Sequence, residues 1–148
     1  MEEFRVPTTS IEVELQFTDS RVQRGAIFVP ASQSVEAWSS DTAAFFPFRP
    51  AGTQGTELIA RRFVVRLSYT APPASGEDTQ TTMERCAVVI ECPGGRFEGE
   101  VILDTPSNQR RLVDYVNQPA AFISLRKGER VHLIQKRLVV RVIQTSAS

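Results

Sequence analysis

The stretch Arg61-Arg62-Phe63-Val64-Val65-Arg66-Leu67 occurs a second time, slightly altered, near the end of the chain. The second stretch reads Lys136-Arg137-Leu138-Val139-Val140-Arg141-Val142 and lies 75 residues later. Over the eleven positions 57–67 and 132–142, six residues are identical. A chain of 148 residues with this internal similarity is predicted to contain two copies of one small unit.

Apolar and polar residues alternate in the segments that precede each copy of this stretch. Residues 11–17 read Ile-Glu-Val-Glu-Leu-Gln-Phe, and residues 86–92, at the same offset, read Cys-Ala-Val-Val-Ile-Glu-Cys. Such alternation is typical of a half-buried strand. Each copy is predicted to contain two strands, a short helix and three more strands. Five short strands cannot cover both faces of a flat sheet, so we expect a strongly bent five-stranded sheet or a partly open barrel.

The predicted fold class is therefore mainly β, or small α+β, with two tandem similar units. The first unit is expected over residues 10–69 and the second over residues 85–143. Residues 70–84 are rich in Pro, Ser, Thr and acidic residues and are predicted to form a linker. Residues 1–9 and 144–148 are expected to be tails. Units of about 60–70 residues are marginal alone, so the two copies are expected to pack together.

Composition limits the classes of partner. The 17 basic and 17 acidic residues balance, so no global field attracts the chain to nucleic acid or to an anionic membrane. No stretch approaches the roughly 18 apolar residues of a membrane span, and the first residues lack the apolar run of a secretory signal. The expected location is the cytoplasm. Cys86 and Cys92 share one face of a predicted strand too long for them to bridge, and with one histidine, His132, no metal site is expected.

The second copy resembles a family of bacterial domains of unknown function. The resemblance covers roughly residues 86–143 and is carried by Arg96-Phe97-Glu98-Gly99-Glu100-Val101, by Arg111-Leu112-Val113-Asp114-Tyr115-Val116-Asn117 and by Phe122-Ile123-Ser124-Leu125. The middle segment is similar to the R-L-x-D-x-(L/V)-N helix motif of that family. The resemblance implies no activity. A looser architectural resemblance links Phe97, Gly99, Leu103-Asp104 and Asn108 to Sm-like small barrels.

Two groups of residues are candidate contacts for a protein partner. Trp38, Phe45 and Phe46 belong to the densest aromatic segment, which could pack in the core or form a binding surface. The predicted helix 108–117 carries Arg111, Leu112, Asp114 and Tyr115, for which structural roles compete with partner contact. In the first copy Ser39 stands opposite Asp114, and Trp38 stands opposite Val113, so the copies differ most at these positions.

Four arginines are candidate contacts for an anion or RNA. Arg62 and Arg137 lie at matching places, and Arg66 and Arg141 alternate with apolar residues, so all four are expected on one outer face. The alternative is a solvated strand face that discourages unwanted edge pairing. No aromatic residue occurs between residues 126 and 141, which argues against stacking on nucleic acid bases.

The sequence contains no nucleophile elbow, phosphate-binding loop, dinucleotide fingerprint or zinc-protease motif. We therefore expect no catalytic residue, no cofactor and no metal. The predicted function is a non-enzymatic interaction or scaffold module that binds another protein and could form a homo-oligomer. The alternatives are an Sm-like RNA-binding protein and a small-molecule sensor with a cavity between the two copies.

Overall fold

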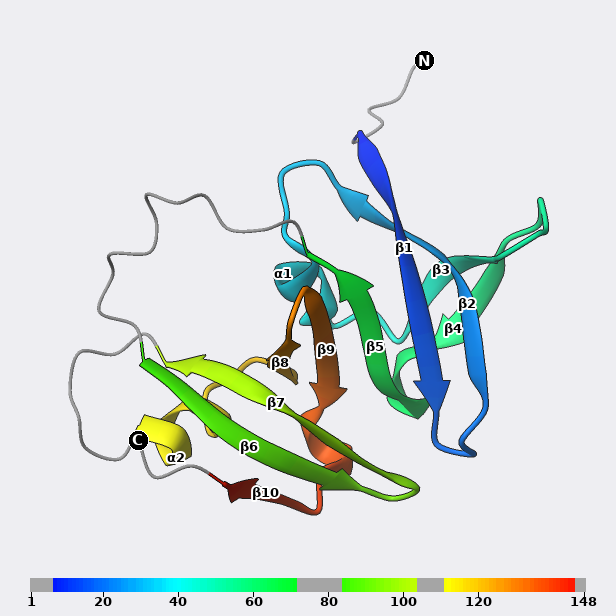
Figure 1. Ribbon diagram of the computed structural model, residues 1–148. Coiled ribbons are helices and arrows are strands. Elements are labelled where there is room, and N and C mark those ends of the chain that lie inside the picture. Colours follow the sequence, from blue (N-terminus) through cyan, green and yellow to red (C-terminus); the bar gives the residue numbers. More distant parts are fainter. Residues whose placement is uncertain (1–6, 72–83, 104–110, 146–148) are drawn as a thin grey trace.

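The chain folds around one antiparallel sheet of ten strands (Figure 1). The computed structural model describes residues 7–71, 84–103 and 111–145. Within these residues, the α-helices are two short ones. The predicted mainly β fold class is thereby confirmed.

The elements follow one another in an order that nearly repeats. The strands are β1 (Thr8–Phe17), β2 (Val22–Pro30), β3 (Phe45–Pro50), β4 (Glu57–Ala60), β5 (Val64–Thr70), β6 (Glu84–Cys92), β7 (Gly95–Leu103), β8 (Phe122–Lys127), β9 (Arg130–Gln135) and β10 (Arg141–Gln144). The helices are α1 (Val35–Ser39) and α2 (Arg111–Val116), and the two 3-10 turns are η1 (Arg61–Phe63) and η3 (Lys136–Leu138).

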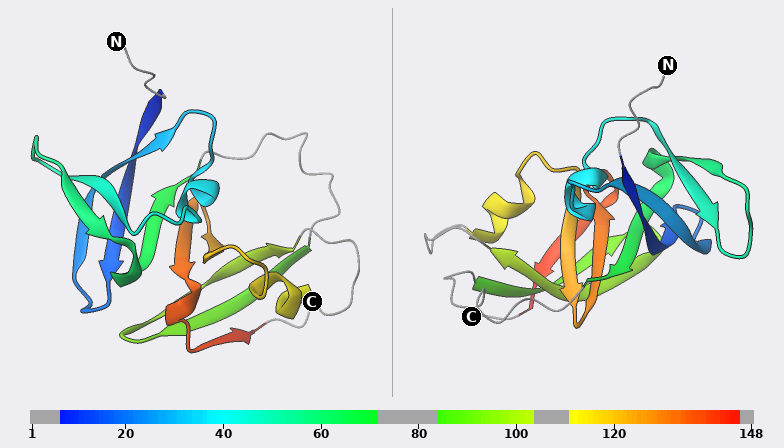
Figure 2. Two further views of the ribbon diagram at one scale, coloured as in Figure 1. Left: turned by 180° about the vertical axis from the view of Figure 1, so that it is seen from behind. Right: turned by 90° about the horizontal axis from the view of Figure 1, so that it is seen from above.

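The strands lie in the order β10-β6-β7-β8-β9-β5-β1-β2-β3-β4. Strand β5 pairs with β1 on one side and with β9 on the other, so it joins the earlier strands to the later ones. Figure 1 and the two views of Figure 2 show the sheet bending strongly on either side of this central pair. Strands β4 and β10 end the sheet at its two edges.

The bend divides the buried apolar side chains into two clusters. The first cluster is built mainly from β1, β2, α1, β3 and β5, and it contains Trp38 and Phe48. The second is built mainly from β6, β7, β8 and β9, and it contains both cysteines, which are free and buried. The predicted core role of Cys86 and Cys92 is confirmed.

Two glycines allow neighbouring strands to approach closely. A Cβ atom on Gly25 would lie 2.3 Å from the carbonyl oxygen of Arg49 in β3, and one on Gly99 would lie 2.5 Å from that of Arg126 in β8. Only a residue without a side chain fits such an approach. These positions bend the sheet at matching places, as the sequence predicted for Gly25.

Several boundaries differ from the predictions. Strand β1 begins at Thr8, inside the predicted tail, because the Pro7 carbonyl already accepts a hydrogen bond from the Ala31 N–H. Residues 61–63 and 136–138 are 3-10 turns rather than parts of strands, so the repeated stretch turns a corner before it enters β5 or β10. Helix α2 is described only over residues 111–116; most of the predicted linker and the predicted start of this helix at 108 lie outside the described residues.

Candidate functional site

A buried polar cluster lies where β5 meets β9. Arg66 is only 7% exposed, and its guanidinium donates to Glu14 Oε2 at 3.1 Å and to Gln16 Oε1 at 3.0 Å. It also donates to the Ser68 hydroxyl, which in turn contacts His132 Nδ1. With the Arg66 donor on the Ser68 oxygen, the hydroxyl proton is left for His132 Nδ1, so the geometry assigns a neutral imidazole that accepts at this nitrogen.

The electrostatics agree with this assignment. Burial, together with the charges of Arg66, Arg130 and Lys127, lowers the pKa of His132 to about 4. Burial by itself would raise the pKa of Glu14, but its hydrogen bonds and ion pairs with Arg66 and Arg24 leave that pKa below its ordinary value. At neutral pH the cluster therefore combines charged Arg66 and Glu14 with neutral His132.

The prediction that Arg66 shares an outer face with Arg62, Arg137 and Arg141 is wrong. Strand β5 has a sheet neighbour on each side and one apolar cluster on each face, so residues 64–69 are all buried. The Arg66 guanidinium lies 5.4 Å from the ring centroid of Phe97 in β7. Arg62 and Arg137 are exposed on the two 3-10 turns, and Arg141 forms an ion pair with Glu91 at 2.8 Å. The four candidate arginines thus do not form one patch.

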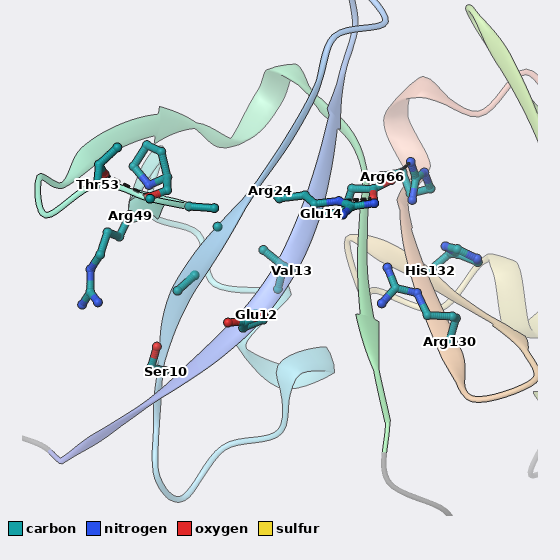
Figure 3. Close-up of a pocket in the computed structure, with 15 residues that line it drawn as sticks. Ser10, Glu12, Val13, Glu14, Arg24, Arg49, Thr53, Arg66, Arg130 and His132 are labelled. Carbon is teal, nitrogen blue, oxygen red and sulfur yellow. Dashed lines mark hydrogen bonds and ion pairs between the residues drawn. The ribbon is translucent and has the colours of Figure 1, made fainter.

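A groove of about 810 Å³ opens beside the polar cluster (Figure 3). It is lined by β1, β2, β3, β5 and β9, so it crosses the junction between the earlier and later strands. Four of its lining side chains are arginines, and two are glutamates: Arg24, Arg49, Arg66, Arg130, Glu12 and Glu14. Glu14 already pairs with two of the arginines, so the groove favours an acidic ligand.

The aromatic candidates separate into buried and exposed residues. Trp38 and Phe46 are buried in the first cluster, with ring centroids 5.1 Å apart in an edge-to-face arrangement. The Arg61 guanidinium lies 4.8 Å from the Trp38 ring centroid, and burial lowers the pKa of Arg61. Phe45 is 56% exposed. The interruption by Pro47 therefore separates rings that face the core from one that faces solvent.

The candidates on α2 lie beside β7 and β8. Leu112 and Tyr115 pack against the second cluster, and the Tyr115 hydroxyl accepts from the Ser124 N–H at 3.2 Å. Asp114 is exposed. The side chain of Arg111 lies outside what the structure describes. The structure thus anchors α2 through its apolar face and leaves Asp114 on the outer side.

The edges of the sheet carry exposed apolar residues that the sequence did not single out. Leu58 on β4 is 69% exposed and Val140 before β10 is 66% exposed. The sequence signal was present, because both belong to the repeated segments whose counterparts, Leu133 and Val65, are each 1% exposed. A repeat that is buried once and exposed once marks a candidate contact surface.

Within the described parts of the chain, no group of three or more His, Cys, Asp or Glu side chains could hold a metal ion. In the same residues, no helix is both long and apolar enough to cross a bilayer. The chain matches no family model, no curated protein and no solved structure.

Proposed function

We propose that the chain is a non-enzymatic interaction or scaffold module, built from two copies of a small β unit, that binds protein at the edges of its sheet. The observation that carries this proposal is the exposure of Leu58 and Val140 at the two ends of the strand order. An edge strand offers unpaired backbone groups that a partner strand can use, and apolar edge residues add buried area.

The pairing of the strands supports the two-copy interpretation. Shifting Glu14↔Ser68 of β1 and β5 by 75 residues gives Val89↔Ile143 of β6 and β10. Phe46↔Ile59 of β3 and β4 similarly corresponds to Ile123↔Ile134 of β8 and β9, with two more residues before β8. Each half also has a short helix after its second strand and a 3-10 turn before its last strand. Under this interpretation each copy contributes five strands.

The environment of the polar cluster supports a non-enzymatic role. Ser68 is fully buried, and Arg66 donates to its hydroxyl oxygen, so this oxygen is neither accessible nor free to attack a substrate. Burial also raises the pKa of the Cys92 thiol to about 11, which keeps it unreactive. The two unbridged thiols agree with a cytoplasmic location.

Affinity capture with variants tests the proposal. Tagged wild-type chain, Leu58→Asp, Val140→Asp and Val113→Asp are compared for proteins retained from a cell extract, including untagged copies of the chain. Val113 is 53% exposed on α2, so its variant introduces the same charge away from both edges. We expect captured proteins to be lost with the edge variants and kept with Val113→Asp. The proposal is wrong if every captured protein binds the edge variants as well as the wild type, or if none is captured.

A second candidate function is small-molecule sensing, which the arginine-lined groove favours. Its position across the β5–β9 junction would couple ligand binding to the relative placement of the two halves. A thermal shift by phosphate or a dicarboxylate, reduced by Arg49→Gln, would support it. RNA binding is less favoured, because Arg66 is buried and Arg141 is paired with Glu91.

A further inference from the structure

The junction between β5 and β9 exchanges apolar side chains between the two halves of the chain. Val65 belongs to β5 but packs in the second cluster, together with Cys92 and Ile134. Leu133 belongs to β9 but packs in the first cluster, together with Leu67. Each half is therefore completed by one side chain from the other.

The counterparts of these two residues are exposed. Seventy-five residues after Val65 stands Val140, and 75 residues before Leu133 stands Leu58. The exposed fraction is 1% for each member of the internal pair, whereas it is 66% for Val140 and 69% for Leu58. The first half thus lacks a side chain equivalent to Val65, and the second half lacks one equivalent to Leu133.

The backbone groups at these edges face outward. The Arg61 N–H donates to the Ala44 carbonyl at 2.8 Å, and backbone groups alternate sides along a strand, so those of Leu58 point away from β3. The Thr145 N–H donates to the Ala87 carbonyl at 2.9 Å, so by the same alternation those of Val142 point away from β6. Both edges have donors and acceptors available for a further antiparallel strand.

A groove of about 450 Å³ runs along the β4 edge. It is lined by Phe17, Leu58, Ile59 and Phe63, together with polar residues of the β1–β2 turn and of β4. Their counterparts at the 75-residue offset are Cys92, Leu133, Ile134 and Leu138, and three of these, all but Leu133, share the second cluster with Val65. The groove is therefore the equivalent of the place that Val65 fills inside the chain.

From these observations we propose that β10 of one copy of the chain pairs antiparallel with β4 of a second copy, placing Val140 in this groove. The register follows from Leu67↔Leu133 in the β5–β9 ladder, which sets Val142 opposite Leu58 of the second copy. This proposal rests on the edge-binding function above and names its partner. Because β4 and β10 end the sheet at opposite edges, they cannot meet within one chain.

The intermolecular pair is expected to be weaker than the internal one. Inside the chain, Gln135 Nε2 donates to the Val64 carbonyl at 2.7 Å and approaches the Arg61 and Arg62 carbonyls at 3.3 Å and 3.4 Å. The residue in the same place on β4 is Ala60, which has no donor on its side chain. Assembly should therefore depend on concentration. Since the two paired surfaces differ, each copy keeps one free edge, and the assembly grows into a ring or a filament.

Sedimentation velocity of the purified full chain tests the proposal. The wild type should exceed the monomer mass increasingly up to roughly 1 mM, a concentration that saturates even weak interfaces. Leu58→Asp and Val140→Asp should each be monomeric alone. An equimolar mixture of the two should form a dimer and nothing larger, because one intact β4 edge and one intact β10 edge remain. Val113→Asp should assemble like the wild type.

Three results would overturn the proposal: a wild type that stays monomeric throughout, edge variants that assemble like the wild type, or a mixture that stays monomeric. Circular dichroism of each variant shows that it is folded, which both substitutions allow because they replace exposed side chains. A monomeric wild type that still captures other proteins through its edges would reject self-pairing alone and leave the proposed interaction function standing.

Discussion

Arg66 carries a full charge at one of the most buried positions of the sheet. Removing a guanidinium from water costs several kcal/mol, so its burial requires compensating partners. Glu14, Gln16 and Ser68 accept from it, and its planar face lies against the Phe97 ring. The partners come from β1, β5 and β7, so the charge can be satisfied only when both halves of the sheet are in place.

The His132 side chain, at the end of this chain of hydrogen bonds, predicts a pH-dependent stability. Its imidazole faces Ser68 and Arg66 of β5, Arg130 of its own strand, and charges from β8 and β1. The folded pKa of about 4 lies below the ordinary value of 6.5, so the unfolded chain binds more protons between these values. The free energy of unfolding should therefore fall as pH falls from 6.5 to 4, with no further loss from this residue below.

Urea unfolding at pH 7, 6, 5 and 4 measures this effect. His132 is partly exposed, so solvent screening reduces its contribution to the order of 1 kcal/mol. The His132→Gln variant keeps an acceptor for the Ser68 hydroxyl but does not titrate, and it should lose less stability over this range than the wild type. Since Glu14 also titrates near pH 4, the difference between the two proteins is the relevant quantity. Equal losses in both would contradict the prediction.

At the level of elements, the close strand approaches at Gly25 and Gly99 predict matching substitution effects. Alanine at either position would place Cβ within 2.5 Å of a carbonyl oxygen on the neighbouring strand, which forces the strands apart. We expect each substitution to lower the free energy of unfolding by about 1–3 kcal/mol, the usual cost of overpacking. Gly55→Ala is the matched control, because nothing lies within 4 Å of the added atom. Urea unfolding of all three variants checks this, and a Gly25→Ala variant as stable as Gly55→Ala would disprove it.

The elements that sequence predicted best are those with a half-buried face. The alternation in residues 11–17 and 86–92 predicted β1 and β6 because one face of each meets a core and the other meets water. Ser34 was a predicted helix cap, and its Oγ accepts from the Ala37 N–H at 3.0 Å. Such local patterns depend on residues a few positions apart, so they can be read along the chain.

Sequence periodicity failed at β5 and at the edges, for a physical reason. The alternation of Arg66 with Val65 and Leu67 suggested an exposed face, yet a strand with neighbours on both sides and apolar clusters on both faces exposes neither. The polar cluster depends on partners at distances of 50 to 64 residues along the chain, which no local pattern encodes. Likewise, Val65 and Val140 stand in nearly identical sequences, and only the strand order decides which one is covered.

For the whole molecule, β5 is the element that both clusters share. Leu67 and Tyr69 pack in the first cluster, while Val65 packs in the second. Helix α1 adds a second connection, since Glu36 Oε2 accepts from the Ser124 hydroxyl of β8 at 3.4 Å. Neither cluster can therefore lose its packing without removing contacts from the other, which is the condition for cooperative unfolding.

The two clusters carry separate natural probes for this cooperativity. Trp38, the only tryptophan, reports on the first cluster by fluorescence, and Cys86 and Cys92, the only cysteines, report on the second by their reaction with a thiol reagent. Burial protects the thiols in the folded chain and raises the pKa of Cys92, so their reaction requires local opening. We expect the fluorescence change and the fraction of rapidly reacting thiols to show the same midpoint in urea. Thiols that react at clearly lower urea than the Trp38 transition would show that the halves unfold independently, and would contradict the role of β5 as a shared strand. The same measurement on Gln135→Ala, which removes the hydrogen bonds to the turn before β5, should separate the two midpoints if any substitution does.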